Sequence, residues 1–86
     1  MTEQIKLAVA GTELVFEPNV TAYNKFINDM SMDNKVAPAV SYLKRIVAAE
    51  SKQALEGFIT RPGAPLQLVA KVNELYAPEL EIEVKN

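Results

Sequence analysis

The 86-residue sequence contains no histidine, no cysteine and no tryptophan. Without imidazole or thiol side chains, the chain lacks the commonest general bases, thiol nucleophiles and transition-metal ligands. The absence of cysteine also excludes disulfide bonds. An enzyme built on this chain would have to work with carboxylates, lysines or hydroxyls. We therefore expect a protein that is not an enzyme and that has neither a catalytic residue nor a cofactor nor a bound metal.

Strong charge of one sign is also missing, because the formal net charge is only −2. The basic residues are scattered singly, apart from Lys44-Arg45, and form no stripe that could follow a phosphate backbone. The first residues, MTEQIKLAVAG, carry charges and only a short apolar run, which is typical of neither a signal peptide nor a membrane span. We expect no nucleic acid partner, no membrane partner and a cytoplasmic location.

An apolar content of 49% with 23% charged residues is typical of a globular domain. The length allows one core, so we expect residues 1–86 to form a single domain. A chain of this size buries a smaller share of its surface than a large protein does, and its stability is correspondingly modest. Association into a homo-oligomer is compatible with that expectation.

The stretch IKLAVAGTELVFE predicts a β-hairpin near the N-terminus. Apolar and polar residues alternate on both sides of Gly11-Thr12, and glycine at the first central position suits a type II′ turn. The register expected from this turn places Val9 opposite Leu14. It also places Lys6 opposite Glu17, which would pair opposite charges across the strands.

Apolar stripes at helical spacing predict four helices, which cover about residues 20–30, 36–47, 52–59 and 65–77. Either Asn19 or Thr21 can cap the first helix. Proline is accepted in the first turn of a helix, which suits Pro38 and Pro65. The stripes place on the core side, among others, Val20, Ile27, Val36 and Leu75.

The last residues, LEIEVKN, predict a strand. Leu80, Ile82 and Val84 alternate with charged residues, of which Glu81 and Glu83 would face water and discourage pairing between sheet edges. A hairpin alone is marginally stable in water, so a third strand would complete it. The predicted fold class is α+β: an N-terminal β-hairpin, about four helices, and a C-terminal strand completing a small three-stranded sheet that helices cover on one face.

Two short patterns resemble chemical motifs without their essential parts. Ser41 and Lys44 have the S-x-x-K spacing of some serine hydrolases, but the sequence lacks the accompanying S-D-N and K-T-G patterns. The stretch from Asp29 spaces oxygen-bearing side chains like an EF-hand loop, but Asn34 stands where glycine is needed and Val40 where the bidentate glutamate is needed. We interpret both as solvent-facing helix and loop residues.

Three apolar residues are candidates for contact with a partner: Met30, Met32 and Leu66. The flexible thioethers of Met30 and Met32 can adapt to varied apolar surfaces. Met30 also lies on the apolar stripe of the first helix, where filling the core is the stronger interpretation. Leu66 widens the apolar side of the fourth helix.

Six sequence words occur in order over about residues 5 to 85: GTELVFEP, YNKFIND, DNKVAPA, ESKQALE, PGA and LYAPELEIEVK. Together they resemble a family of short phage tail assembly chaperones. The resemblance lies in the order and spacing of these words, none of which is a catalytic motif. It therefore transfers no catalytic or binding residue to this chain.

The resemblance implies a protein that binds the long tape measure protein, keeps its apolar helical segments from aggregating and helps to recruit tail tube subunits. No use of ATP is implied. The setting would be the cytoplasm of a bacterial host that carries a phage or prophage. The alternative is a minor structural component of the tail, or a homo-oligomeric adaptor without chaperone activity.

Overall fold

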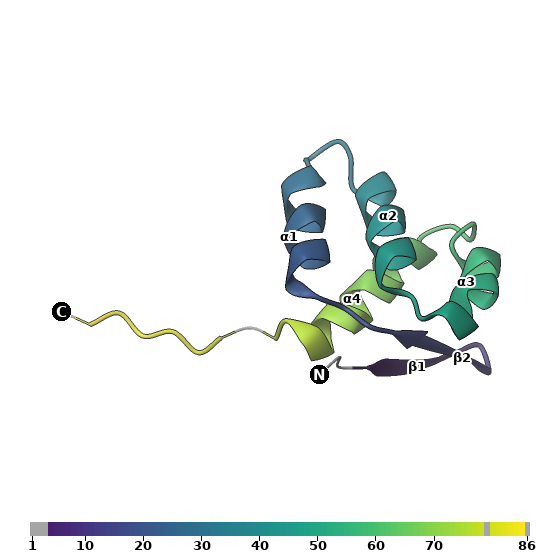
Figure 1. Cartoon of the computed structure of the whole chain (residues 1–86). Helices are drawn as coiled ribbons and strands as arrows, with labels where there is room; N and C mark the ends of the chain where they lie inside the picture. Colours follow the sequence, from purple (N-terminus) through teal and green to yellow (C-terminus); the bar gives the residue numbers. More distant parts are fainter. Residues whose placement is uncertain (1–3, 79, 86) are drawn as a thin grey trace.

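The chain folds into a β-hairpin followed by four α-helices (Figure 1). The computed structural model describes residues 4–78 and 80–85. The elements are, in order, β1 (Ile5–Val9), β2 (Thr12–Phe16), α1 (Val20–Asp29), α2 (Val36–Ile46), the 3₁₀ helix η1 (Ala49–Ser51), α3 (Lys52–Phe58) and α4 (Ala64–Tyr76). Figure 1 shows the helices gathered on one side of the hairpin. This is the α+β architecture that the sequence predicts.

The hairpin turn lies one residue earlier than predicted. Ala10 and Gly11 occupy its two central positions, with φ angles of 49° and 83°. Two consecutive positive φ angles are typical of a type I′ turn, whose twist matches that of the flanking strands. The predicted type II′ turn at Gly11-Thr12 is therefore wrong.

The earlier turn shifts the strand register by two residues. Leu7 lies opposite Leu14, and Lys6 lies opposite Val15 instead of Glu17. A shift by two keeps every side chain on its predicted face, because side chains alternate with a period of two. The observed register pairs Ile5 with Phe16, and both side chains are buried.

The hairpin and all four α-helices contribute to one hydrophobic core. Tyr42 is the largest of its fully buried side chains. Four residues predicted on the core side are instead exposed: Val20, Ile27, Val36 and Leu75. They lie in the first or last turns of their helices.

The helix boundaries follow from local chemistry. Of the two predicted caps of α1, the structure uses Asn19, whose Oδ1 accepts a hydrogen bond from the backbone N–H of Ala22 at 2.8 Å. Gly63 precedes α4 with a φ of 75°, a conformation that glycine adopts without steric cost, and Pro65 lies in the first turn. Proline is tolerated there because the first backbone N–H groups of a helix have no partner within it.

The outer edge of β2 pairs with the chain that leaves α2. The N–H of Glu17 donates to the carbonyl of Ile46 at 2.6 Å, and the N–H of Ala48 donates to the carbonyl of Val15 at 2.8 Å. The side chain of Ser51 completes this edge, because its Oγ accepts a hydrogen bond from the N–H of Val15 at 2.9 Å. This non-repetitive segment takes the neighbouring position that a third strand would occupy.

Residues 80–85, which we call the C-terminal arm, form no strand. Figure 1 shows the arm running away from the end of α4 and from the hairpin. Its three apolar side chains are 75%, 79% and 86% exposed at Leu80, Ile82 and Val84. The predicted closing strand is therefore absent from this part of the chain. Alternation indicates which side chains would share a face of a strand, but it does not identify the neighbouring strand.

The other face of the hairpin is also less open than predicted. Val15 points to the side opposite Leu14, yet it is only 4% exposed. β2 also contacts η1 and α3, the two elements that follow the chain leaving α2. At Val15, this face of β2 is therefore less exposed than the alternating pattern predicts.

Candidate functional site

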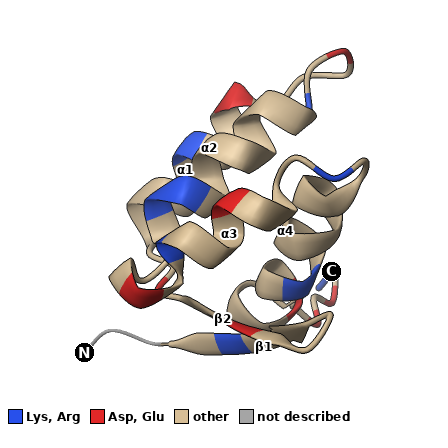
Figure 2. Ribbon diagram, turned by 90° about the vertical axis from the view of Figure 1, so that its right-hand side faces the viewer, with Lys and Arg blue, Asp and Glu red and all other residues tan. Residues whose placement is uncertain are grey.

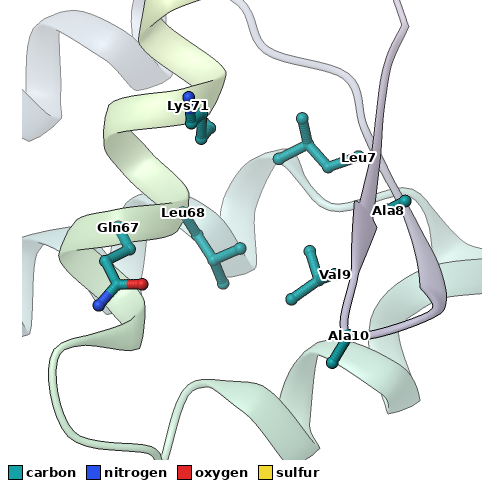
Figure 3. Close-up of a pocket in the computed structure, with 7 residues that line it drawn as sticks. All are labelled: Leu7, Ala8, Val9, Ala10, Gln67, Leu68 and Lys71. Atoms are coloured by element: carbon teal, nitrogen blue, oxygen red, sulfur yellow. The ribbon is translucent and has the colours of Figure 1, made fainter.

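A groove separates β1 from α4 (Figure 3). Its volume is about 350 Å³. In Figure 3, Leu7 and Val9 point from β1 toward α4, and Leu68 points from α4 toward β1. The complete lining consists of Leu7, Ala8, Val9, Ala10, Gln67, Leu68 and Lys71.

The sequence builds this groove from two simple periodicities. Alternation along β1 sends Leu7 and Val9 to the same side of the sheet. On α4, Gln67 and Lys71 are four residues apart and therefore lie on one helix face, beside Leu68. The result is an apolar floor with a polar rim.

The chemistry of the groove favours binding over catalysis. Among its seven lining residues, Lys71 is the only one with an ionisable side chain. Its Nζ lies 3.5 Å from Oε2 of Glu74, and both side chains are largely exposed. Such an exposed ion pair contributes little to stability and leaves both groups accessible. An apolar segment of a partner, with an acidic residue beside it, would complement this surface.

Three exposed apolar residues lie in or beside the connection between the first two helices, and we refer to them as the α1–α2 patch. Its exposed members are Ile27, Met32 and Val36. They come from the last turns of α1, the connecting loop and the first turn of α2. The side chain of Met32 is 92% exposed. Sequence reasoning found Met32 but assigned Ile27 and Val36 to the core, although their positions next to a loop could have indicated exposure.

The three candidate contact residues lie on two separate parts of the fold. Met30 and Met32 lie directly after α1, and Leu66 lies in the first turn of α4. Met30 is half-buried and packs against the core, as its place on the stripe indicates. Met32 and Leu66 are exposed and accessible to a partner. Their part in binding stays a prediction.

Among the described residues, Tyr42 is the ionisable group whose pKa is most clearly shifted, and its surroundings are those of a structural residue. Its ring stacks on Phe26 with centroids 4.9 Å apart and meets Tyr23 edge to face at 6.3 Å. Its hydroxyl donates to Oδ1 of Asn73 at 3.2 Å. Burial, with smaller contributions from Tyr76 and Tyr23, raises the pKa of Tyr42 to about 12. A tyrosine that holds its proton so firmly is a poor general acid.

The two incomplete motifs form no chemical site. Ser41 and Lys44 are both exposed on α2. Asp29 forms an ion pair with Lys25, in which Nζ and Oδ2 are 3.1 Å apart. The loop after α1 is closed by a backbone hydrogen bond from the N–H of Ser31 to the carbonyl of Asn34 at 3.0 Å. Within residues 4–78 and 80–85, no group of three or more metal-binding side chains comes together.

The surface charge has no dominant sign in the view of Figure 2, where basic and acidic segments are interspersed over the helices and the hairpin. None of the helices in the described part of the chain has the length and apolar content needed to cross a membrane. The distinctive surfaces are thus the groove, the α1–α2 patch and the C-terminal arm, and each of them presents apolar side chains.

Comparison with known proteins identifies the family to which this chain belongs. A family model described as "Phage tail assembly chaperone" matches residues 5–86. A protein of Haemophilus phage HP1 (strain HP1c1), described as an "Uncharacterized 11.3 kDa protein in lys 3'region", is 43% identical over 86 residues, which are 100% of this chain and 84% of that protein. No solved structure matches the chain. The match to the family model extends over nearly the whole sequence, and this chain therefore belongs to the phage tail assembly chaperone family.

Proposed function

We propose that this protein is a non-enzymatic chaperone that binds the tape measure protein during phage tail assembly and aids the recruitment of tail tube subunits. The observation that carries the proposal is the family match over residues 5–86. The action would take place in the cytoplasm of the bacterial host, where the tail is built. Binding without chemistry also suits a chain that has no histidine and no cysteine.

The exposed apolar surfaces support a holding role. A tape measure protein is long and helical, and apolar stripes on its helices would be prone to aggregation before the tube surrounds them. The α1–α2 patch offers such stripes an apolar contact that includes the adaptable thioether of Met32. We propose Met32 and Leu66 as contact residues, with Met30 contributing from its half-buried position.

Co-expression with the tape measure protein of the same phage tests the proposal. We expect the tape measure protein to become more soluble and to be recovered in a complex with this chain. Met32→Asp and Leu66→Asp should weaken the complex, because each places a charge in an apolar contact. Ser41→Asp, on an exposed polar position of α2, is the matched control and should leave the complex intact.

Unchanged solubility of the tape measure protein, with no complex recovered, would contradict the chaperone function. Analysis of purified phage particles separates this function from that of a minor structural component. A chaperone should be absent from finished tails. A stoichiometric amount of this chain in those tails would favour the structural alternative.

A further inference from the structure

The outer edge of β1 presents backbone groups that can accept another strand. In the antiparallel pair, Lys6 lies opposite Val15 and Ala8 lies opposite Glu13. Val15 directs its own N–H and carbonyl away from β1, to Ser51 and Ala48. In an antiparallel ladder, two directly opposite residues either both point their backbone N–H and carbonyl groups at each other or both point them away. Lys6 and Ala8 therefore direct their N–H and carbonyl groups away from β2. In the described part of the chain, the sheet has two strands and β1 has a strand neighbour only on the β2 side.

The groove beside β1 supplies the side-chain contacts that an added strand needs. Leu7, Val9 and Leu68 form an apolar recess on the helix-facing side (Figure 3). Lys6 is exposed on the opposite face of the sheet. An incoming strand would therefore fit best with apolar residues at every second position and acidic residues between them.

The C-terminal arm has this pattern. Leu80, Ile82 and Val84 alternate with Glu81 and Glu83. In an extended strand, the apolar residues would face the recess while the two carboxylates faced the side that carries Lys6. The arm has six residues and β1 has five, so the two segments match in length.

We propose that the C-terminal arm of a second copy of this chain adds as a strand to the outer edge of β1, so that two copies exchange arms in a symmetric dimer. Within one copy, the arm runs away from the hairpin (Figure 1), which leaves the edge and the arm both available. In a two-fold symmetric dimer, each copy contributes its arm to the partner and receives the partner's arm on its own β1. The open edge of β1 and the apolar side chains of the arm are then covered in both copies. Each hairpin thereby becomes a three-stranded sheet. This inference does not depend on the proposed function.

The oligomeric state of the whole chain is the first test, measured by light scattering after gel filtration. We expect the chain to be dimeric when its concentration is raised to about 100 μM. Ile82→Asp should weaken the dimer at least tenfold, because it places a charge in the apolar recess. Met32→Asp adds the same charge at an exposed apolar position of the α1–α2 patch, far along the chain from the arm, and should leave the dimer unchanged.

Cross-linking identifies the segment that is exchanged, and the natural chain has no cysteine to interfere. A chain with Ala8→Cys is mixed with a chain that carries Glu83→Cys, since both positions lie on the same face of the proposed sheet. Oxidation should join one copy of each, and adding Ile82→Asp to the second chain should reduce the yield of that product at least severalfold. A further variant carries both cysteines in one chain, where a bond between copies is expected.

A monomeric whole chain over this concentration range would overturn the proposal. So would a double-cysteine variant that closes only within one chain, because the arm would then cover its own β1. Failure to bind the tape measure protein would leave these results unaffected. Two variants distinguish the arm-exchanged dimer from the proposed chaperone function. Met32→Asp should impair tape measure binding alone, and Ile82→Asp should impair the dimer.

Discussion

The two edges of the hairpin differ in how their backbone groups are satisfied. The outer edge of β2 is closed by the segment that runs from the end of α2 through η1, with three hydrogen bonds to Ile46, Ala48 and Ser51. The outer edge of β1 adjoins an apolar groove instead. Exposed sheet edges are templates for pairing, and proteins usually protect them. Within the described residues, one edge is protected by backbone groups and the side chain of Ser51, and the other edge is left accessible.

The difference between the two edges indicates that β2 contributes mainly to stability and β1 mainly to binding. Leu14 and Phe16 of β2 are fully buried, whereas Leu7 and Val9 of β1 are half-buried and line the groove. Substitutions in β2 should therefore lower the free energy of unfolding, and substitutions along β1 and the arm should mainly affect association. The first two predictions below test this division, and the next two test the helical core and the turn, in order of decreasing expected effect.

Leu14→Ala and Leu7→Ala form a matched pair, because the two leucines lie opposite each other on one face of the hairpin. Leu14→Ala should lower the free energy of unfolding by roughly 2–5 kcal/mol, the usual cost of emptying a core position. Leu7→Ala should cost about 1 kcal/mol, because its side chain is partly exposed already. Urea unfolding measures both. Equal costs would show that β1 is covered as completely as β2.

Ser51→Ala removes the side-chain acceptor of the buried N–H of Val15. Leaving that donor without a partner should cost about 1–3 kcal/mol. Hydrogen exchange should show faster exchange of the Val15 amide in particular. Ser41→Ala, on the exposed side of α2, is the control and should change stability by no more than about 0.5 kcal/mol. Similar effects from both substitutions would mean that Ser51 does not close the edge.

High pH should lower the free energy of unfolding, because the buried Tyr42 resists ionisation in the folded state. An unfolded tyrosine ionises near pH 10, whereas the pKa of Tyr42 in the folded state is raised to about 12. Between these values the unfolded state loses a proton that the folded state keeps, so stability falls as the pH rises above about 10. Below that pH this contribution is constant.

The doubly substituted variant Tyr23→Phe and Tyr76→Phe isolates this titration, because Tyr42 is then the only tyrosine in the chain. Ultraviolet absorbance of tyrosinate in the folded protein should rise above the pH at which it rises in the same variant unfolded by urea. Burial is the largest cause of the raised pKa and persists in this variant. Coincident titration curves would contradict the buried position of Tyr42.

The smallest effect concerns the turn between the two strands. Ala10 has a φ of 49°, which is costly for a residue with a Cβ atom. Ala10→Gly should change stability favourably, by up to about 1 kcal/mol, because relief of this cost outweighs the added freedom of the unfolded chain. Gly11→Ala, at a φ of 83° with open space around the added Cβ, should lose about 1 kcal/mol. The opposite order in thermal unfolding would contradict the type I′ turn.

The helices could be predicted because their signals are local. Asn19 was one of two expected caps, and Pro38 and Pro65 lie in first turns as the rule for helix starts predicts. The hairpin was also predictable, but its register was not. The expected attraction between Lys6 and Glu17 favoured a turn at Gly11-Thr12, whereas the observed pairing buries Ile5 and places an alanine in a left-handed conformation.

The core and the edges depend on contacts that are distant in sequence. Tyr42 was missed because α2 packs against both α1 and α4, so its buried surface is wider than one stripe. Ser51 precedes α3, but its side chain does not cap that helix; its Oγ instead accepts a hydrogen bond from the N–H of Val15, 36 positions away in the sequence. The groove itself was not predicted, because it exists only where β1 and α4 meet.

The aromatic residues described above also determine how the protein can be observed in solution. All three tyrosines belong to one connected set of rings that joins α1, α2 and α4, and the chain has no tryptophan. Intrinsic fluorescence therefore reports on this helical junction and is insensitive to the turn and the arm. In a mixture, any emission from tryptophan belongs to the other protein, so a tail component can be followed in the complex without a label.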